Sequence, residues 1–185
     1  VILCNDTYIF NNCGQIEYSG PSQVQCEDGY VDDNLNGMVT VINGIQYWIV
    51  PFDASYTIDI MGARGGESTY LFNYGWGARM KGDFLFTKGD TIKILVGQMG
   101  TDDYFRSGGG GGTFVSTMNN DPLIVAGGGG GQTHNYAYQT YSNADTTESG
   151  NSSSCNYSGG SNGDGGTCYS NGPRGGGGYY EDGNT

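Results

Sequence analysis

Apolar and polar residues alternate in short runs from about Tyr8 to Val125, which is the pattern of β-strands with one buried face. No stretch of this part shows a convincing helical period. In MVTVINGIQYWIV, two apolar runs flank Asn43-Gly44, a dipeptide that accepts positive φ at both central positions of a type I′ turn. The pattern predicts a β-hairpin at this point.

Two more segments have the same alternation and predict further strands. SYTIDIMGA and DTIKILVGQ each place three apolar residues on one face, namely Tyr56, Ile58 and Ile60 in the first, and Ile92, Ile94 and Val96 in the second. Lys93 points outward in the second segment, and Lys88-Gly89-Asp90 supplies the turn that precedes it. Strands at this spacing predict a sandwich or jelly-roll layer.

The composition changes after Arg106, since 22 of the 36 glycines lie in residues 108–185. Two runs of five glycines, 108–112 and 127–131, join directly to the apolar segments TFV and LIVA, which a flexible linker would not need. Polyglycine can form an extended helix with three residues per turn and a rise of about 3.1 Å per residue, and its N–H groups can bond to neighbouring rods. We expect ordered glycine rods, with a linker as the alternative.

The charge is strongly acidic and unevenly placed. The formal net charge is −12, residues 1–63 contain eight Asp or Glu and no Lys or Arg, and six of the seven basic residues fall between Arg64 and Arg106. An acidic face is expected. It would repel phosphate backbones and anionic membranes, so nucleic acid is excluded as a partner, whereas a basic protein ligand fits.

The five cysteines are Cys4, Cys13, Cys26, Cys155 and Cys168. They include no CxxC pair, and His134 is the only histidine, so disulfides are favoured over a metal site. Asn5, Asn151 and Asn156 begin N-glycosylation sequons. Together these features predict an extracellular, secreted chain carrying N-linked glycans. Residues 1–185 contain no signal peptide and no apolar run long enough to cross a membrane. We therefore expect these residues to be part of a processed precursor and not to insert into a membrane.

An ordered set of segments resembles a known family. YIFNNCGQIEYSGPSQVQC, GIQYWIVPFDASYTIDIMGARGG, KGDTIKILVGQMG, GGGGGTFV and PLIVAGGGGG resemble the glycine-rich, ligand-binding ectodomain region of the anaplastic lymphoma kinase and leukocyte tyrosine kinase receptors. The resemblance runs from about Tyr8 to Gly131. Unlike those receptors, residues 1–185 contain no kinase domain, which puts signalling by this chain in doubt.

The resemblance implies a mainly β fold, a TNF-like (jelly-roll) β-sandwich into which polyglycine helices are inserted. We expect residues 1–106 to be mostly sandwich strands and residues 107–185 to be a glycine-rich region interleaved with them, all in one compact unit. The resemblance also implies a disulfide between Cys13 and Cys26. Proximity in sequence alone suggests pairing of Cys155 with Cys168, which leaves Cys4 for an intermolecular bond.

The candidate chemical motifs are weak. DDNLNG at 32–37 has the first offsets of a calcium loop, but Asn43 stands at its twelfth position and no helices flank it, so a turn before a strand is favoured. The glycine runs lack the context of a phosphate site, and His134 has no partner motif. We expect no catalytic residue, no metal and no cofactor, and therefore no enzyme.

The first functional hypothesis is a structural subunit that self-associates into filaments or a matrix. Its basis is the apolar start VILCNDTYIF, which can add to the sheet edge of a neighbour, although it can equally be the first strand of its own sandwich. The alternative is a receptor ectodomain that binds a basic protein ligand. The 15 tyrosines also suit a glycan-binding adhesin, or simple packing over a glycine core.

Overall fold

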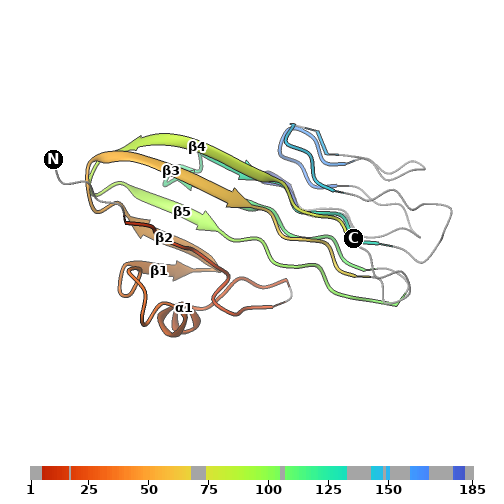
Figure 1. Cartoon of the computed structure of the whole chain (residues 1–185), viewed down its shortest axis with the longest axis horizontal. Coiled ribbons are helices and arrows are strands. Elements are labelled where there is room, and N and C mark those ends of the chain that lie inside the picture. The colour runs from red at the N-terminus through yellow and green to blue at the C-terminus, as the bar shows by residue number, and fades with distance from the viewer. Residues whose placement is uncertain are drawn as a thin grey trace.

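The structure is a computed structural model that describes residues 6–16, 18–67, 74–104, 107–132, 143–147, 149–150, 159–166 and 177–181. It is mainly β, with two antiparallel sheets and, in the described part, one short helix, α1 (Gln23–Gly29). The larger sheet has the order β1-β2-β5-β6-β7, formed by Val39–Ile42, Ile45–Ile49, Thr91–Leu95, Thr113–Thr117 and Pro122–Ala126. The smaller sheet pairs β3 (Ala54–Met61) with β4 (Arg79–Phe86), and the arrangement is consistent with a β-sandwich (Figure 1).

The hairpin expected at Asn43-Gly44 is confirmed. β1 and β2 pair from Val39 opposite Trp48 to Ile42 opposite Ile45, and the two turn residues have φ of 50° and 79°. Glycine is also required there for space, because a Cβ on Gly44 would lie 2.5 Å from the Cα of Gly20. The turn therefore fixes the register of the hairpin and brings the segment before α1 against it.

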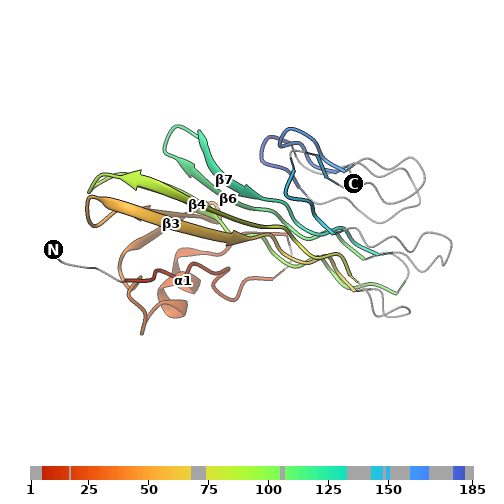
Figure 2. The ribbon, with the colours of Figure 1, turned by 45° about the horizontal axis from the view of Figure 1, so that its top comes forward.

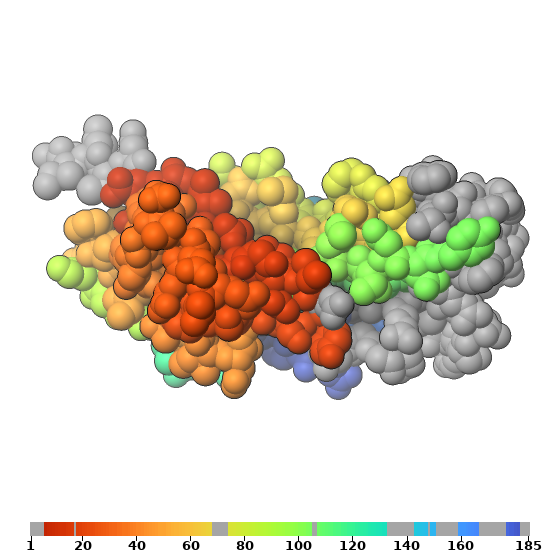
Figure 3. Space-filling view, turned by 90° about the horizontal axis from the view of Figure 1, so that it is seen from below, coloured from red at the N-terminus to blue at the C-terminus, as the bar shows by residue number. Residues whose placement is uncertain are grey.

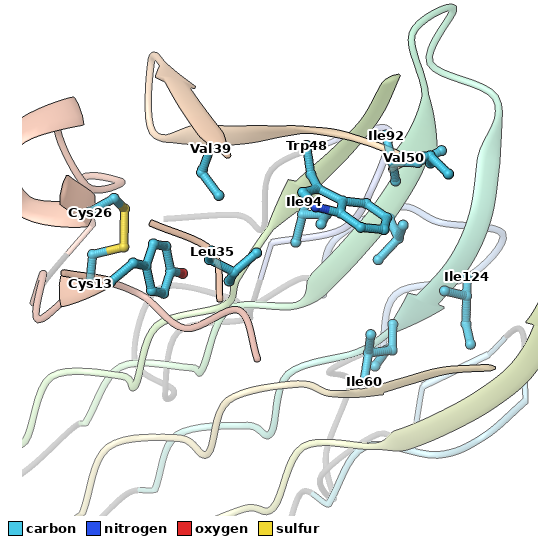
Figure 4. Close-up of a cluster of buried hydrophobic side chains, with 13 residues drawn as sticks. Cys13, Cys26, Leu35, Val39, Trp48, Val50, Ile60, Ile92, Ile94 and Ile124 are labelled. Carbon is cyan, nitrogen blue, oxygen red and sulfur yellow. A yellow bond between two sulfur atoms is a disulfide. The ribbon is translucent and has the colours of Figure 1, made fainter. Parts of the chain in front are cut away.

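The core lies between the two sheets, and the alternation predicted for the strands places its side chains there. Ile92 and Ile94 of β5 and Ile60 of β3 are buried, as expected, and Trp48 of β2 lies among them (Figure 4). The Trp48 ring contacts three aromatic rings, with centroids 5.0 Å from Tyr8, 5.9 Å from Phe10 and 5.7 Å from Tyr56. The N-terminal segment thus closes one side of the core.

The sequence indicated short strands and no helix from Tyr8 onward, and this expectation was wrong for the segment before the hairpin. Described residues before Val39 form α1 and turns instead of a strand. Helix α1 begins at a capping box, in which the Ser22 hydroxyl accepts a bond from the Gln25 N–H and the Gln25 side chain accepts one from the Ser22 N–H. The QVQC alternation after this cap resembles a strand, but the segment has no neighbouring strand to pair with in the described part of the structure, so a capped helical turn satisfies more of its backbone groups than an isolated extended segment would.

Five glycine-rich segments extend from strand ends on one side of the sandwich (Figure 2). We call them the glycine bundle: residues 62–66, 75–78, 97–101, 107–112 and 127–132. Three of them continue from the C-terminal ends of β3, β5 and β7, and two lead into β4 and β6. The sandwich strands therefore hold the segments side by side before the bundle begins.

Segments of the glycine bundle bond to one another through their main chains. Segment 62–66 has bonds to all four others, which include Ala63 N–H to Gly111 O at 2.9 Å and Gly65 N–H to Gly75 O at 2.8 Å. At several glycines the packing leaves no room for a side chain; a Cβ on the buried Gly110, for example, would lie 2.3 Å from the Ala63 oxygen. The two glycine runs are thus bonded parts of the structure and do not act as a linker.

Candidate partner-binding surface

Helix α1 and the turns after it form a surface that we call the acidic cap, residues 22–33. A disulfide between Cys13 and Cys26, the pair implied by the family resemblance, ties α1 to the N-terminal segment, with an S–S distance of 1.97 Å. Both cysteines are buried against the hydrophobic core (Figure 4). The helix has only seven residues, too few to be stable alone, so this bond and the capping box hold it in place.

Tyr30 anchors the other end of α1 to the larger sheet. Its side chain is buried, and its hydroxyl donates to the Gln46 side-chain oxygen at 2.8 Å and accepts from the Asn11 N–H at 3.0 Å. The Gln46 amide donates in turn to the Asn11 oxygen at 2.7 Å. Burial raises the pKa of Tyr30 above its ordinary value of 10.0, so the phenol stays neutral and can donate. The acidic cap consequently rests on a rigid support.

Four exposed carboxylates, on Glu27, Asp28, Asp32 and Asp33, crowd the acidic cap. Within the described residues, the one ion pair joins Arg79 to Asp59 on the smaller sheet at 2.6 Å, away from the cap. Glu27 and Asp28 lie in the last turn of α1, which contains no basic residue and carries the negative end of the helix dipole. The four charges therefore repel one another and the helix end.

Two apolar side chains are exposed among these carboxylates. Val24 on α1 and Val31 just after it are 63% and 59% exposed. The space-filling view shows the N-terminal segment and the acidic cap, in red and orange, spread over one face of the molecule (Figure 3). Exposed apolar groups on the same short segment as four like charges suit contact with a partner that has both basic and apolar groups.

The DDNLNG segment belongs to the turns of this cap. The Asn34 side-chain amide donates to the Thr7 oxygen at 2.8 Å, and that of Asn36 donates to the Val31 oxygen at 2.7 Å. Leu35 between them is buried in the core. The two amides thus brace the turns, which fits the turn that the sequence favoured over a calcium loop. In the described part of the chain, no three His, Cys, Asp or Glu side chains are grouped so that they could hold a metal ion.

Several predicted sites lie outside the described residues. They are Cys4, Asn5, His134, Asn151, Cys155, Asn156 and Cys168. Their pairing and glycosylation remain predictions. The Tyr30 network and α1 were missed from the sequence; the Ser22-x-x-Gln25 capping pattern was the available signal for α1. Among the helices of the described residues, none has the length and apolar character needed to cross a membrane.

Comparison with known proteins shows a similarity to a receptor. The chain is 36% identical over 101 residues to the leukocyte tyrosine kinase receptor of Mus musculus. That stretch is 51% of this chain but spans only 11% of the receptor, and no protein-family model matches. The similarity favours the receptor ectodomain over the filament subunit, which no comparison supports. With the disulfide, it indicates an extracellular or membrane-associated segment, and it relates about half of the chain to this receptor family.

Proposed function

We propose that the chain is a non-enzymatic, extracellular recognition module of the receptor-ectodomain type, and that its acidic cap binds a basic protein partner. One observation carries this proposal: residues 22–33 expose four carboxylates together with Val24 and Val31 on a braced support, with no basic residue in the cap. The partial similarity to a receptor supports the same class of function.

Electrostatics explains how such a surface would work. A field of one sign attracts an oppositely charged partner over a distance of about 10 Å at moderate salt and raises the association rate. On contact, Lys or Arg side chains of the partner would relieve the repulsion at the end of α1, where Glu27 and Asp28 lie. The exposed valines would then lose their contact with water, which lowers the dissociation rate.

The glycine bundle supports a more specific description of the scaffold, polyglycine helices inserted in a TNF-like sandwich. A β-strand directs its backbone groups to two sides, whereas a helix with three residues per turn directs them to three. Segment 107–112 has bonds to three other segments, through Ala63, Gln98 and Gly129 among others, and none of its glycines has positive φ. We therefore assign these segments to the polyglycine type, as a stiff arm beside the binding surface.

The proposed secretion fits the disulfide, since such bonds persist in oxidising compartments. N-linked glycans at Asn5, Asn151 and Asn156 are part of the proposal because each begins a sequon. Mass spectrometry of the native protein, before and after enzymatic removal of N-glycans, tests their occupancy.

The binding proposal is tested with a charge variant of the full chain. Glu27→Gln, Asp28→Asn, Asp32→Asn and Asp33→Asn remove four charges but keep the oxygens that accept from Gln23 and from the Leu35 N–H. Basic extracellular proteins are captured on the wild-type chain, purified and measured by surface plasmon resonance. We expect the association rate to fall about tenfold or more in the variant, and to fall with salt in the wild type.

A matched control neutralises four exposed carboxylates elsewhere, on Asp83, Asp121, Asp164 and Glu181. It changes the net charge equally but leaves the acidic cap intact, so it should retain most of the wild-type rate. Equal loss in both variants would mean that net charge alone attracts the partner. Unchanged binding in the cap variant would remove the cap from the interface.

A further inference from the structure

An apolar row crosses the outer face of the five-stranded sheet. Ile42 lies opposite Ile45, and Phe114 lies opposite both Leu95 and Val125. Between these groups, Gln46 of β2 lies opposite Ile94 of β5. The next position in the same antiparallel register places Ile45 beside Leu95. Each strand thus contributes one apolar side chain to the face that points away from Trp48 and the core. We call these five residues the outer row: Ile42, Ile45, Leu95, Phe114 and Val125.

This face differs from the usual outer face of an antiparallel sheet, where polar residues alternate with buried ones. Ile42 is 50% exposed, and Ile49 on the same face of β2 is 58% exposed. Tyr47 lies between them on that face, opposite Thr40 and Lys93. Apolar side chains on two strands therefore form an open patch at the β1–β2 end of the sheet.

Among the described residues, a ring contact covers the other end of the outer row. The Tyr179 ring packs edge-on against Phe114, with centroids 5.5 Å apart, and the Tyr179 hydroxyl donates to the Asn120 oxygen at 2.6 Å. Ile42 lies at the opposite end of the row, on the far edge strand of the sheet. The patch around Ile42 and Ile49 therefore lies on the same sheet face as Phe114, which already packs against the aromatic side chain of Tyr179.

Charge indicates which partner fits this patch. The five strands of the larger sheet contain no Asp or Glu, although the chain has 19 of them, and their one charged residue is Lys93, whose ammonium group donates to the Asn120 side chain. Two copies of a chain with net charge −12 repel each other through acidic surfaces. Two copies can therefore approach through this sheet face without bringing its strands' own carboxylates together.

The free edge of β1 is blocked, which favours contact through faces instead of edges. The Gln23 side-chain amide donates to the Val39 oxygen at 3.2 Å and accepts from the Val41 N–H at 2.6 Å. It therefore occupies backbone groups that another strand would need in order to pair.

We propose that two copies of this chain associate face to face through the outer side of the β1–β2 hairpin, around Ile42 and Ile49, in a two-fold symmetric dimer. Such an interface uses the same patch on both copies and closes on itself, so it forms a dimer and no filament. The acidic caps stay available because they lie on α1 and its turns. Association should strengthen with salt, since screening reduces the repulsion between the copies, whereas binding of a basic partner should weaken.

Sedimentation velocity of the full chain tests the proposal from about 1 µM to about 100 µM, a range that covers weak protein association. We expect a monomer–dimer equilibrium that shifts toward dimer in high salt. The variant Ile42→Glu/Ile49→Glu should weaken dimerisation about tenfold or more, because it places carboxylates in an apolar contact. Leu85→Glu on the smaller sheet, where Leu85 is 86% exposed, is the matched control and should dimerise like the wild type.

Hydroxyl-radical labelling of the wild-type chain gives a second measurement that needs no variant. Labelling of Ile42, Tyr47 and Ile49 should decrease as the concentration rises, while that of Val24 and Val31 stays constant. A monomer throughout the range, a dimer unaffected by the Ile42 and Ile49 changes, or protection of the acidic cap instead would each overturn the proposal. Neutralising the acidic cap should leave the dimer intact, so the two proposals fail independently.

Discussion

Gly128 lies inside the glycine bundle, where its substitution by alanine gives a sharp test of the packing. A Cβ at this position would lie 2.0 Å from the Gly110 oxygen, and its three nearest atoms all belong to backbone. Real Cβ contacts essentially never fall below 3.0 Å, so the two segments must separate by about 1 Å. No side-chain rotation can relieve this contact.

The cost follows from the bonds that the separation would break. Gly110 N–H donates to the Gly129 oxygen at 2.7 Å, and a further 1 Å would take this distance to about 3.7 Å, beyond hydrogen-bonding range. An unpaired buried N–H costs about 1–3 kcal/mol, and overpacking adds about 1–3 kcal/mol. Alanine returns about 0.4–1 kcal/mol by restricting the unfolded chain. The net loss for Gly128→Ala is about 1–5 kcal/mol with a middle value of about 3 kcal/mol, which corresponds to roughly 6–12 °C in melting temperature for a chain of this size.

Gly127→Ala is the control at the neighbouring position. Its Cβ would meet nothing closer than the Ala144 Cβ at 3.7 Å, an ordinary contact, so stability should stay within about 1 kcal/mol of the wild type or increase. Calorimetry measures both variants, and hydrogen exchange should show faster exchange at Gly110 only in Gly128→Ala. Equal melting temperatures for the two variants would refute the close lateral packing of these segments.

Three other changes test the support of the acidic cap. Tyr30→Phe should lower the free energy of unfolding by about 1–3 kcal/mol in urea titration, because it leaves the buried side-chain oxygen of Gln46 and the Asn11 N–H without the Tyr30 hydroxyl. Tyr18→Phe, at a residue that is 96% exposed, should have no effect. Because folding raises the pKa of Tyr30, this group contributes fully to the free energy of unfolding below pH 10, and the contribution is lost as the pH rises further. The stability of the wild type should therefore fall more steeply above pH 10 than that of Tyr30→Phe. Parallel curves of stability against pH would contradict this. Replacing Cys13 and Cys26 by serine opens a loop with a sequence separation of 13 and should cost about 3 kcal/mol, and a stable cap without the bond would contradict this. Gln23→Glu retains an acceptor for the Val41 N–H but loses the donor to the Val39 oxygen, so amide exchange along β1 should accelerate; exchange like that of the wild type would show that the edge is held otherwise.

The strands could be predicted because apolar and polar side chains alternate along their sequences. Ile58 and Ile60 in β3, and Ile92 and Ile94 in β5, face the core as their alternation indicated. The Asn43-Gly44 turn was equally readable, since few dipeptides accept two successive positive φ angles. By contrast, α1 is too short to show a helical period, and only its capping box marks it.

The lateral order of the glycine bundle could not be predicted from the sequence. Glycine has no side chain to reveal which way a residue faces, so nothing in the runs shows that Ala63 bonds to Gly111 and Gly129. The acidic surface could be anticipated from charge counts, but the placement of residues 22–33 against the larger sheet depends on the disulfide and on the Tyr30 contact with Gln46. These are tertiary contacts that composition does not encode.

The close approach of main chains in the bundle limits how this protein can change over time. An ordinary hydrophobic core adapts by exchanging one side chain for another of similar volume, but at the closely packed glycines of the bundle no such exchange is open. At those positions the number of residues in a segment can vary more readily than the type of residue. The glycine bundle can therefore become longer or shorter more readily than it can change in sequence. The sandwich and its acidic cap, which do have side chains to vary, remain free to acquire new specificities while the arm stays fixed.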